Sequence, residues 1–148
     1  MEGILLTELS YPVLTVITFL PLVGALIILL LRNAAQIKWL ALVTTIATFI
    51  ASLPVYKHFD KTTHLMQFVE THSWISAWNI NYQVGIDGIS VLFLLLTAIL
   101  SILCVTVSWN AIQIKTKEFY ISLLIMETAM MGILVSLNVF LFYLFWEL

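Results

Sequence analysis

Polar and apolar positions along this chain are sorted into long blocks. Four apolar blocks each run for roughly 20 residues, which is the length of α-helix that crosses the hydrocarbon core of a bilayer. A fifth apolar block holds the last ten residues of the sequence. The pattern predicts four full spanning helices and the start of a fifth, at about 11–31, 39–56, 89–109, 119–136 and 139–148.

Composition agrees with a chain that lies in lipid. The 148 residues are 62% hydrophobic and 9% charged, whereas a typical soluble domain is about one quarter charged. So few charges cannot cover the surface of a water-soluble globule of this size. We therefore predict an all-α fold, a polytopic transmembrane helix bundle that forms a single membrane domain over residues 1–148.

The basic residues of the two short connectors predict the orientation of the chain. Both connectors lie on the same side of the membrane if every block spans it, and the acidic N-terminus lies on the other side. Basic loops face the cytoplasm in most membrane proteins, so we expect the N-terminus outside. The four basic side chains are Arg32, Lys38, Lys115 and Lys117.

The remaining connector, residues 57–88, is long and is predicted to be an extracytoplasmic loop. Its Trp74, Trp78 and Tyr82 are aromatic residues of the kind that favours the headgroup zone. A short amphipathic helix is compatible with residues 65–70. The loop also holds three histidines whose spacing of six and eight residues gives no metal-ligand set: His58, His64 and His72.

Several classes of chemistry have no motif in this sequence. Cys104 is the only cysteine, which excludes an internal disulfide framework and a cysteine metal cluster. The chain has no phosphate-binding glycine loop, no Ser/His/Asp set and no haem or iron–sulfur ligand spacing. With a net charge of −2 and no basic block, it has no nucleic-acid signature. We expect no cofactor and no redox chemistry in this chain itself.

Two carboxylic acids fall near the centre of the predicted membrane layer. Glu147 is nine residues beyond Asn138, or about 13–14 Å deep at 1.5 Å per residue, and Glu127 is eight residues beyond Phe119 on the neighbouring helix. A charge at such a depth costs about 2.5–3.5 kcal/mol on insertion scales, and residues of this kind usually face a bundle interior or a hydrated path.

Proton transfer would explain both acids. A buried carboxyl avoids the cost of burial by staying protonated, and it can release and recover the proton when a neighbouring cation moves. We interpret Glu147 as a catalytic proton-relay residue and Glu127 as a second relay residue. In the alternatives, Glu147 ends a segment that never spans, and Glu127 is a neutral, hydrogen-bonded packing residue. Asp87, in GIDGIS before the third block, is interpreted as a helix cap or turn residue.

Small and hydroxyl residues form stripes along three of the blocks. Stripes of this kind let helices approach closely and hydrogen-bond across their interface. A solute pathway would also use them, but packing is a sufficient explanation. The stripe of the third block comprises Ser90, Thr97, Ser101, Cys104 and Ser108.

Two stretches carry a resemblance to a known family: GIDGISVLFLLLTAIL (residues 85–100) and METAMMGILVSLNVFLFYLFWEL (residues 126–148). Together they resemble the proton-pumping, antiporter-like subunits of NADH–quinone oxidoreductase, respiratory complex I, and most closely its subunit M, or subunit 4. Mrp-type cation/proton antiporters are relatives of that family. The resemblance covers nearly the whole chain and is strongest after Trp74.

The resemblance implies roles for particular residues. Glu147 matches the family's helix-five glutamate, which pairs with a lysine on a later, broken helix, and Glu127 aligns with a helix-four acid that some members have. Asn138 stands where many members have Asp. The resemblance also implies FMN and iron–sulfur clusters in partner subunits. The implied partners are other membrane subunits of complex I, the lipid bilayer and protons.

Three hypotheses follow for the function. The first is a membrane subunit of NADH–quinone oxidoreductase that takes part in proton translocation coupled to electron transfer from NADH to quinone. The second is an Mrp-type antiporter subunit, and the third is a small structural membrane protein. Because family members are much longer, we expect an N-terminal portion of a longer protein. We expect a multi-pass protein of the bacterial plasma membrane, although an organelle inner membrane or a thylakoid membrane would give the same pattern.

Overall fold

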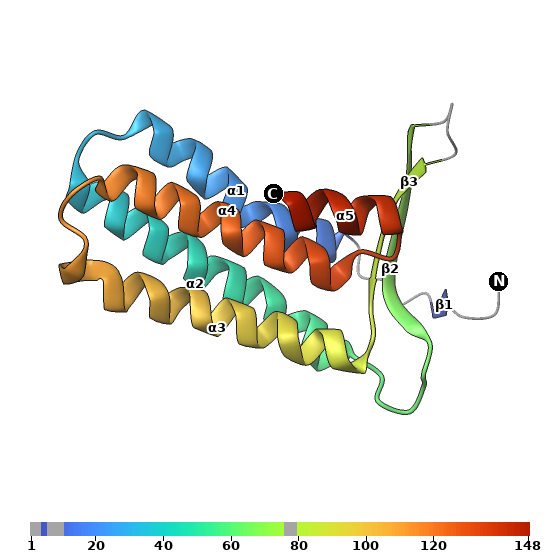
Figure 1. Ribbon diagram of the computed structural model, residues 1–148. Helices are drawn as coiled ribbons and strands as arrows, with labels where there is room; N and C mark the ends of the chain where they lie inside the picture. Colours follow the sequence, from blue (N-terminus) through green and yellow to red (C-terminus); the bar gives the residue numbers. More distant parts are fainter. Residues whose placement is uncertain (1–3, 6–10, 76–79) are drawn as a thin grey trace.

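Helices dominate the computed structural model, which describes residues 4–5, 11–75 and 80–148; Trp78 lies outside the described residues. Four long helices lie side by side as a bundle, and a shorter fifth helix packs at one end of it (Figure 1). Each of the four long helices is long and apolar enough to cross a membrane. The helices are α1 (Val13–Leu30), α2 (Ala34–His58), α3 (Gly88–Ala111), α4 (Thr116–Val135) and α5 (Val139–Glu147).

The helical bundle confirms the predicted fold class, but α2 is longer than its apolar block. It begins at Ala34 instead of residue 39 and ends at His58 instead of residue 56. Asn33 explains the early start, because its side chain accepts a hydrogen bond from the Ala35 backbone N–H at 2.9 Å, which satisfies a free donor of the first turn. Polar residues outside the apolar block can therefore continue the helix into the headgroup zone.

Two strands of a small sheet lie within the segment predicted to be a loop. Strands β2 (Met66–Ile75) and β3 (Ile80–Ile86) pair antiparallel, and β1 (Ile4–Leu5) runs parallel to β2. The helix considered for residues 65–70 is therefore wrong. A strand is stabilised by side-chain pairs with a partner strand elsewhere in the sequence. The pattern of apolar and polar residues within 65–70 could therefore not reveal that this segment is part of β2.

The sheet covers the end of the bundle opposite the two basic connectors (Figure 1). The connector between α4 and α5 joins its edge, where the Leu137 backbone N–H donates to the Gln83 carbonyl oxygen at 3.0 Å. Phe68 has a left-handed backbone (φ 54°) next to a register shift in β2, and its side chain is buried. This bulge fixes the sheet onto the apolar core.

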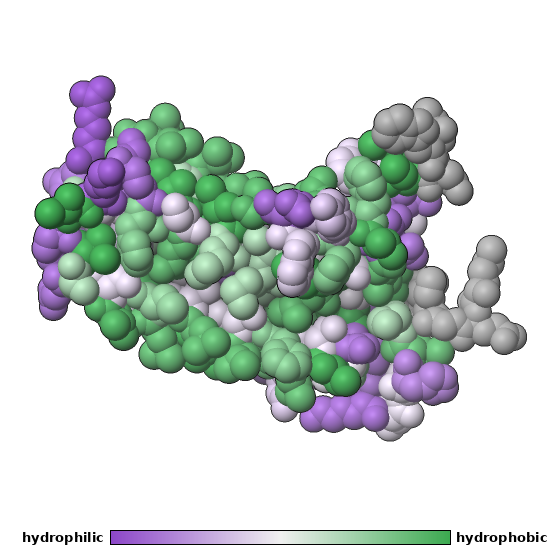
Figure 2. Space-filling view, in the orientation of Figure 1, coloured by the Kyte–Doolittle hydropathy of each residue, from purple (hydrophilic) through white to green (hydrophobic). Residues whose placement is uncertain are grey.

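Two apolar clusters form the core. One lies toward the sheet and includes Leu14, Leu94 and Val135, and the other lies toward the basic connectors and includes Ile28, Val105 and Leu124. The outside is apolar as well. Figure 2 shows hydrophobic side chains over the middle of the bundle and hydrophilic ones gathered mainly toward its two ends, as expected for a bundle that spans a membrane.

Candidate functional site

A layer of buried polar side chains separates the two apolar clusters. Each of the four long helices contributes to it, and its α2 members extend along that helix from Thr44 to Ser52, or about 12 Å. Buried polar groups are costly unless they are paired or functional, which makes this layer the candidate site. Its members are Thr18 of α1, Thr44, Thr45, Thr48 and Ser52 of α2, Thr97 and Ser101 of α3, and Glu127 and Thr128 of α4.

Glu127 is the one ionisable member of this layer among the described residues. Its side chain is 1% exposed, and neither carboxyl oxygen has a hydrogen bond of normal geometry to the described residues. Ser101 of α3 is the polar side chain that faces it. An ionised carboxylate without a partner is very costly in such a place. The surroundings therefore favour the neutral acid until a cation or water reaches it.

The hydroxyl groups of the layer donate mainly to their own helices. Thr18 donates to the Leu14 carbonyl oxygen at 2.8 Å, Thr48 to that of Thr44 at 3.0 Å, and Thr128 to that of Leu124 at 3.1 Å. A hydroxyl that has used its proton in this way still has lone pairs that accept hydrogen bonds. The layer can therefore accept hydrogen bonds from a protonated carboxyl or from water, which is the chemistry that proton transfer requires.

Glu147 is the last residue of α5 and is exposed. The same helix turns Phe145 inward against Gly132 of α4, where an added Cβ would collide with the ring. Gly132 and Glu127 are five residues apart, or about 140° around α4 at 100° per residue. Helix α5 therefore lies on a different face of α4 from the Glu127 carboxyl.

The two acids nevertheless have similar depths. The contact between Phe145 and Gly132 gives a common reference depth for the two helices. Glu147 lies two residues beyond Phe145 along α5, or about 3 Å deeper in the bundle. Glu127 lies five residues before Gly132 along α4, or about 7.5 Å deeper. The structure thus places both acids near mid-bundle but does not bring them together. Glu127 faces the inside of the four-helix bundle, and Glu147 faces outward.

Asp87 lies at the start of α3, outside the polar layer. Its carboxylate accepts hydrogen bonds from the backbone N–H groups of Ser90 at 2.7 Å and Ile89 at 3.1 Å. The Ser90 hydrogen bond holds the pKa of Asp87 below its usual value. Asn138 caps α5 in the same way, because its side-chain oxygen accepts a hydrogen bond from the Phe140 backbone N–H at 2.8 Å. Both residues cap helices.

One acid that the sequence analysis did not single out has a clear structural role. The carboxylate of Glu70, in β2, accepts hydrogen bonds from the Leu14 backbone N–H at 2.7 Å and from the Thr15 backbone N–H at 3.2 Å. Thr15 also shares a hydrogen bond of 2.9 Å with the Tyr82 hydroxyl, whose burial raises the pKa of that phenol. Since Glu70 and α1 are far apart in sequence, no local pattern predicts this contact.

Two lysines that the sequence pattern places in the basic connectors, Lys38 and Lys117, lie near the starts of α2 and α4 and have structural roles. The Lys38 ammonium donates to the Trp109 carbonyl oxygen at 2.6 Å, in the last turn of α3. The Lys117 ammonium donates to the carbonyl oxygens of Leu29 at 2.6 Å and Leu31 at 3.1 Å, at the end of α1. Cations stabilise the C-terminal ends of helices, so the residues that predict the orientation also hold the bundle together.

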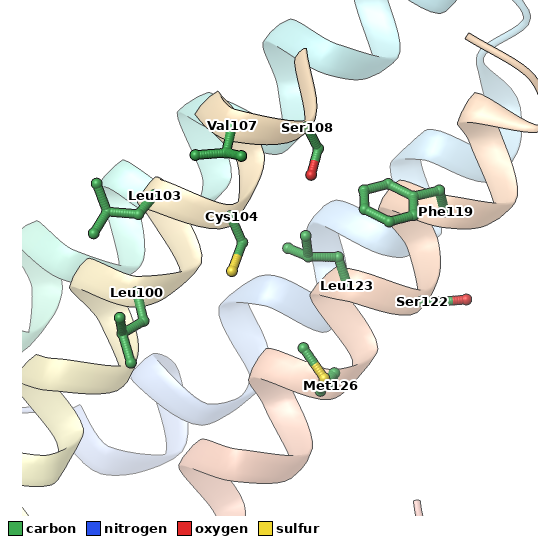
Figure 3. Close-up of a pocket in the computed structure, with 9 residues that line it drawn as sticks. All are labelled: Leu100, Leu103, Cys104, Val107, Ser108, Phe119, Ser122, Leu123 and Met126. Atoms are coloured by element: carbon green, nitrogen blue, oxygen red, sulfur yellow. The ribbon is translucent and has the colours of Figure 1, made fainter. Parts of the chain in front are cut away.

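A groove of about 490 Å³ opens between α3 and α4 (Figure 3). Cys104 and Leu123 approach each other across it, whereas Ser122 points away from it. A smaller cavity of about 150 Å³ shares Cys104 and Leu123 with the groove and extends to Thr97 and Ser101 of the polar layer. Among the described residues, no group of three His, Cys, Asp or Glu side chains could hold a metal ion.

Comparison with known proteins gives several related sequences and a related structure, and no family model matches the chain. NADH-quinone oxidoreductase subunit M of Rhodobacter capsulatus is 39% identical over 140 residues, which cover 90% of this chain and 27% of the relative. NADH-ubiquinone oxidoreductase chain 4 of Marchantia polymorpha is 37% identical over 139 residues, which cover 93% and 28%.

The structural comparison agrees with these sequences. A chain of respiratory complex I from Thermus thermophilus, solved with bound NADH, matches with a TM-score of 0.71 at 22% identity, over 90% of this chain and 26% of that chain. The likeness confirms the membrane-bundle fold. The chain spans between a quarter and a third of the length of these relatives.

Proposed function

Because this chain is homologous to subunit M and chain 4 of NADH–quinone oxidoreductases over about nine tenths of its length, we propose that it belongs to a membrane subunit of such an enzyme. In this proposal the complete subunit takes part in proton translocation coupled to electron transfer from NADH to quinone. The electron carriers, FMN and iron–sulfur clusters, are in partner subunits. This chain supplies part of the path for protons.

The observation that carries the proposal is the buried carboxyl of Glu127 inside the polar layer, with the Ser101 hydroxyl as its polar neighbour. A packing residue at this depth would have its hydrogen bonds satisfied by neighbouring groups. Each of the four long helices instead contributes hydroxyl groups to this layer, which suits a site where a proton is held and passed on. The outward-facing Glu147 has no such surroundings within the described residues.

The two acids have different proposed roles. Glu147, on the outer face of α5, is the relay residue that exchanges its proton with a basic group outside this chain. Glu127 is a second relay residue that holds a proton inside the bundle. Since the two carboxyls face in different directions, a proton passes between them only through water or another hydrogen-bonding group that reaches the layer.

A substitution at Glu147 tests the proposed function. Glu147→Gln removes the titratable group and keeps the shape of the side chain, so in the complete enzyme proton pumping coupled to NADH oxidation should collapse. Glu118→Gln, which alters an exposed acid in the first turn of α4, is the matched control and should pump normally. Unchanged pumping by the Glu147→Gln enzyme would contradict the relay role.

The antiporter and structural-protein hypotheses predict different partners. The reported relatives are oxidoreductase subunits, so the antiporter hypothesis is not favoured. Purification of the complete protein from its own membrane distinguishes the three. Flavin and iron–sulfur absorbance in the purified complex is expected, whereas sodium-dependent proton exchange without a flavin would support the antiporter.

The chain is a multi-pass membrane protein, and we propose the bacterial plasma membrane as its location, with the two basic connectors in the cytoplasm. The relatives come from bacteria and from organisms with organelles, so fractionation of the source cells is the test. Recovery of the protein in an organelle membrane fraction would contradict the proposed location.

A further inference from the structure

The groove between α3 and α4 has the dimensions of one acyl chain in one leaflet. It extends on α3 from Leu100 to Ser108 and on α4 from Phe119 to Met126. Eight residues of α3 are about 12 Å, and one leaflet contributes about 15 Å of the hydrocarbon core. One end of the groove lies at the connector between the two helices, and the other end lies near mid-bundle.

The walls of the groove are apolar and uncovered. Leu103 is 51% exposed and Val107 is 77% exposed, and the polar lining groups, Cys104 and the hydroxyls, are few (Figure 3). Water gains little in an apolar groove of this kind. An acyl chain can fill the groove at little cost in free energy, because the bilayer interior that it leaves is equally apolar.

The polar end of the groove carries positive charge. Lys115 precedes Phe119 by one helical turn, and the Phe119 backbone N–H donates to the Lys115 carbonyl oxygen at 3.1 Å. The Lys115 side chain is exposed, whereas Lys38 and Lys117 are committed to carbonyl oxygens. Within residues 32–38 and 110–118, the two basic connectors predicted from the sequence, Glu118 is the only acid, so four basic residues against one acid leave a net charge of +3.

We propose that the groove between α3 and α4 binds an anionic phospholipid of the inner leaflet, with one acyl chain between the two helices and the headgroup at Lys115. The charge lies where a headgroup would be and the apolar walls lie where a chain would be. A helix packed into the groove would explain the apolar walls but would have no need for the free cation. The proposal depends on the predicted orientation and is independent of proton translocation.

Photo-crosslinking in nanodiscs tests the proposal on the complete protein. Phosphatidylglycerol and phosphatidylcholine, each with a diazirine in one acyl chain, are compared as probes, and labelled residues are mapped by tandem mass spectrometry. We expect labelling of the groove by the anionic probe to exceed that by the zwitterionic probe about fivefold. One basic residue near an anionic membrane surface contributes about 1 kcal/mol of binding free energy, which corresponds to about a fivefold difference in affinity.

Matched variants distinguish the effect of the Lys115 charge and of the open groove from a general effect of substitution on the fold. Lys115 has a left-handed backbone (φ 52°), which Asn adopts readily, so Lys115→Asn removes the charge without backbone strain and should bring the two probes to equal labelling. Lys61→Asn, in the outer loop, should leave the ratio unchanged. Cys104→Phe fills the groove and should reduce labelling by both probes, whereas Leu96→Phe, outside the groove on the same helix, should not.

Three results would overturn the proposal. Equal labelling of the wild-type groove by the two probes would remove the preference for anionic lipid. If Cys104→Phe does not reduce the labelling, the acyl chain does not occupy the space between α3 and α4. Absence of labelling in the complete protein would mean that a protein segment covers the groove. The pumping assay of Glu147→Gln is unaffected by any of these results, so the two proposals fail separately.

Discussion

The Glu70 carboxylate lies at the start of α1, where it accepts a hydrogen bond from the Leu14 backbone N–H at 2.7 Å. The first N–H groups of a helix have no partner within the helix, and Pro12, the residue before α1, makes no side-chain cap. Strand β2, from the segment between α2 and α3, therefore supplies the cap, with a negative charge at the positive end of the helix dipole. The loop and the first spanning helix are held as one unit.

Removal of this cap should destabilise the bundle. We expect Glu70→Ala to lower the free energy of unfolding by about 1–2 kcal/mol, the usual cost of losing an N-cap, and Glu70→Gln to cost less because the amide oxygen still accepts. Thermal unfolding of the complete protein in detergent measures the change. Glu118→Ala, at an exposed acid, is the control. An equal effect of the two Ala substitutions would contradict the capping role.

Close packing of α5 depends on Gly132. A Cβ at this position would collide with the Phe145 ring, so Gly132→Ala should displace α5 and destabilise the protein by about 1–3 kcal/mol, the range for overpacked cores. Phe145→Leu should restore part of that loss in the double variant. Gly88→Ala is the control, because a Cβ there meets Phe59 at an ordinary 3.8 Å.

A double-mutant cycle on thermal stability reads out the coupling. If the losses from Gly132→Ala and Phe145→Leu simply add, the contact between these two residues does not hold α5, and this account of its position is wrong.

The buried ammonium of Lys38, near the start of α2, should contribute measurably to stability. Lys38→Met keeps the apolar stem but leaves the Trp109 carbonyl oxygen without its 2.6 Å donor, so we expect a loss of about 1–3 kcal/mol, the cost of an unsatisfied buried group. Lys115→Asn should change stability by less than about 0.5 kcal/mol, as is usual for exposed positions. Chemical unfolding of both variants compares them, and equal losses would contradict the structural role of Lys38.

Sequence reasoning found the helices because each depends on a local property, a run of apolar residues long enough to cross lipid. It did not find β2 and β3, whose pairing joins positions such as His72 and Tyr82, nor the caps that Glu70 and Lys38 supply to distant helices. These contacts exist only after the chain is folded. The partners in the two caps are 56 and 71 residues apart in sequence, so no short window contains both.

The candidate site shows the same division. The depths of Glu127 and Glu147 follow from counting residues along the helices, and the structure places both near mid-bundle. The directions of their side chains depend on how α4 and α5 pack, and the contact between Gly132 and Phe145 sets that packing. Counting residues suggested a pair of acids, whereas the structure separates a buried acid from an exposed one.

Asp87 should make stability depend on pH in acid. Its pKa is lowered in the folded protein, with the Ser90 hydrogen bond as the largest cause, so its contribution is fully present above the unfolded pKa of about 3.9 and is lost as the pH falls through the folded value. Asp87→Asn keeps a capping side chain that cannot titrate. Below about pH 4 the wild type should lose stability relative to this variant, as thermal unfolding at a series of pH values would show. A constant difference would contradict the assignment.

We propose that the buried polar layer around Glu127 carries protons and is not only a packing feature. The most direct test is proton pumping by the complete enzyme with Glu127→Gln, which keeps the volume of the side chain and removes its exchangeable acid proton. Assembly and thermal stability of each variant are measured alongside, with Glu118→Gln, at the exposed acid in the first turn of α4, as the control that should pump normally. Glu127→Gln is expected to assemble normally but to pump fewer protons per NADH oxidised. Normal pumping by an assembled Glu127→Gln enzyme would contradict it.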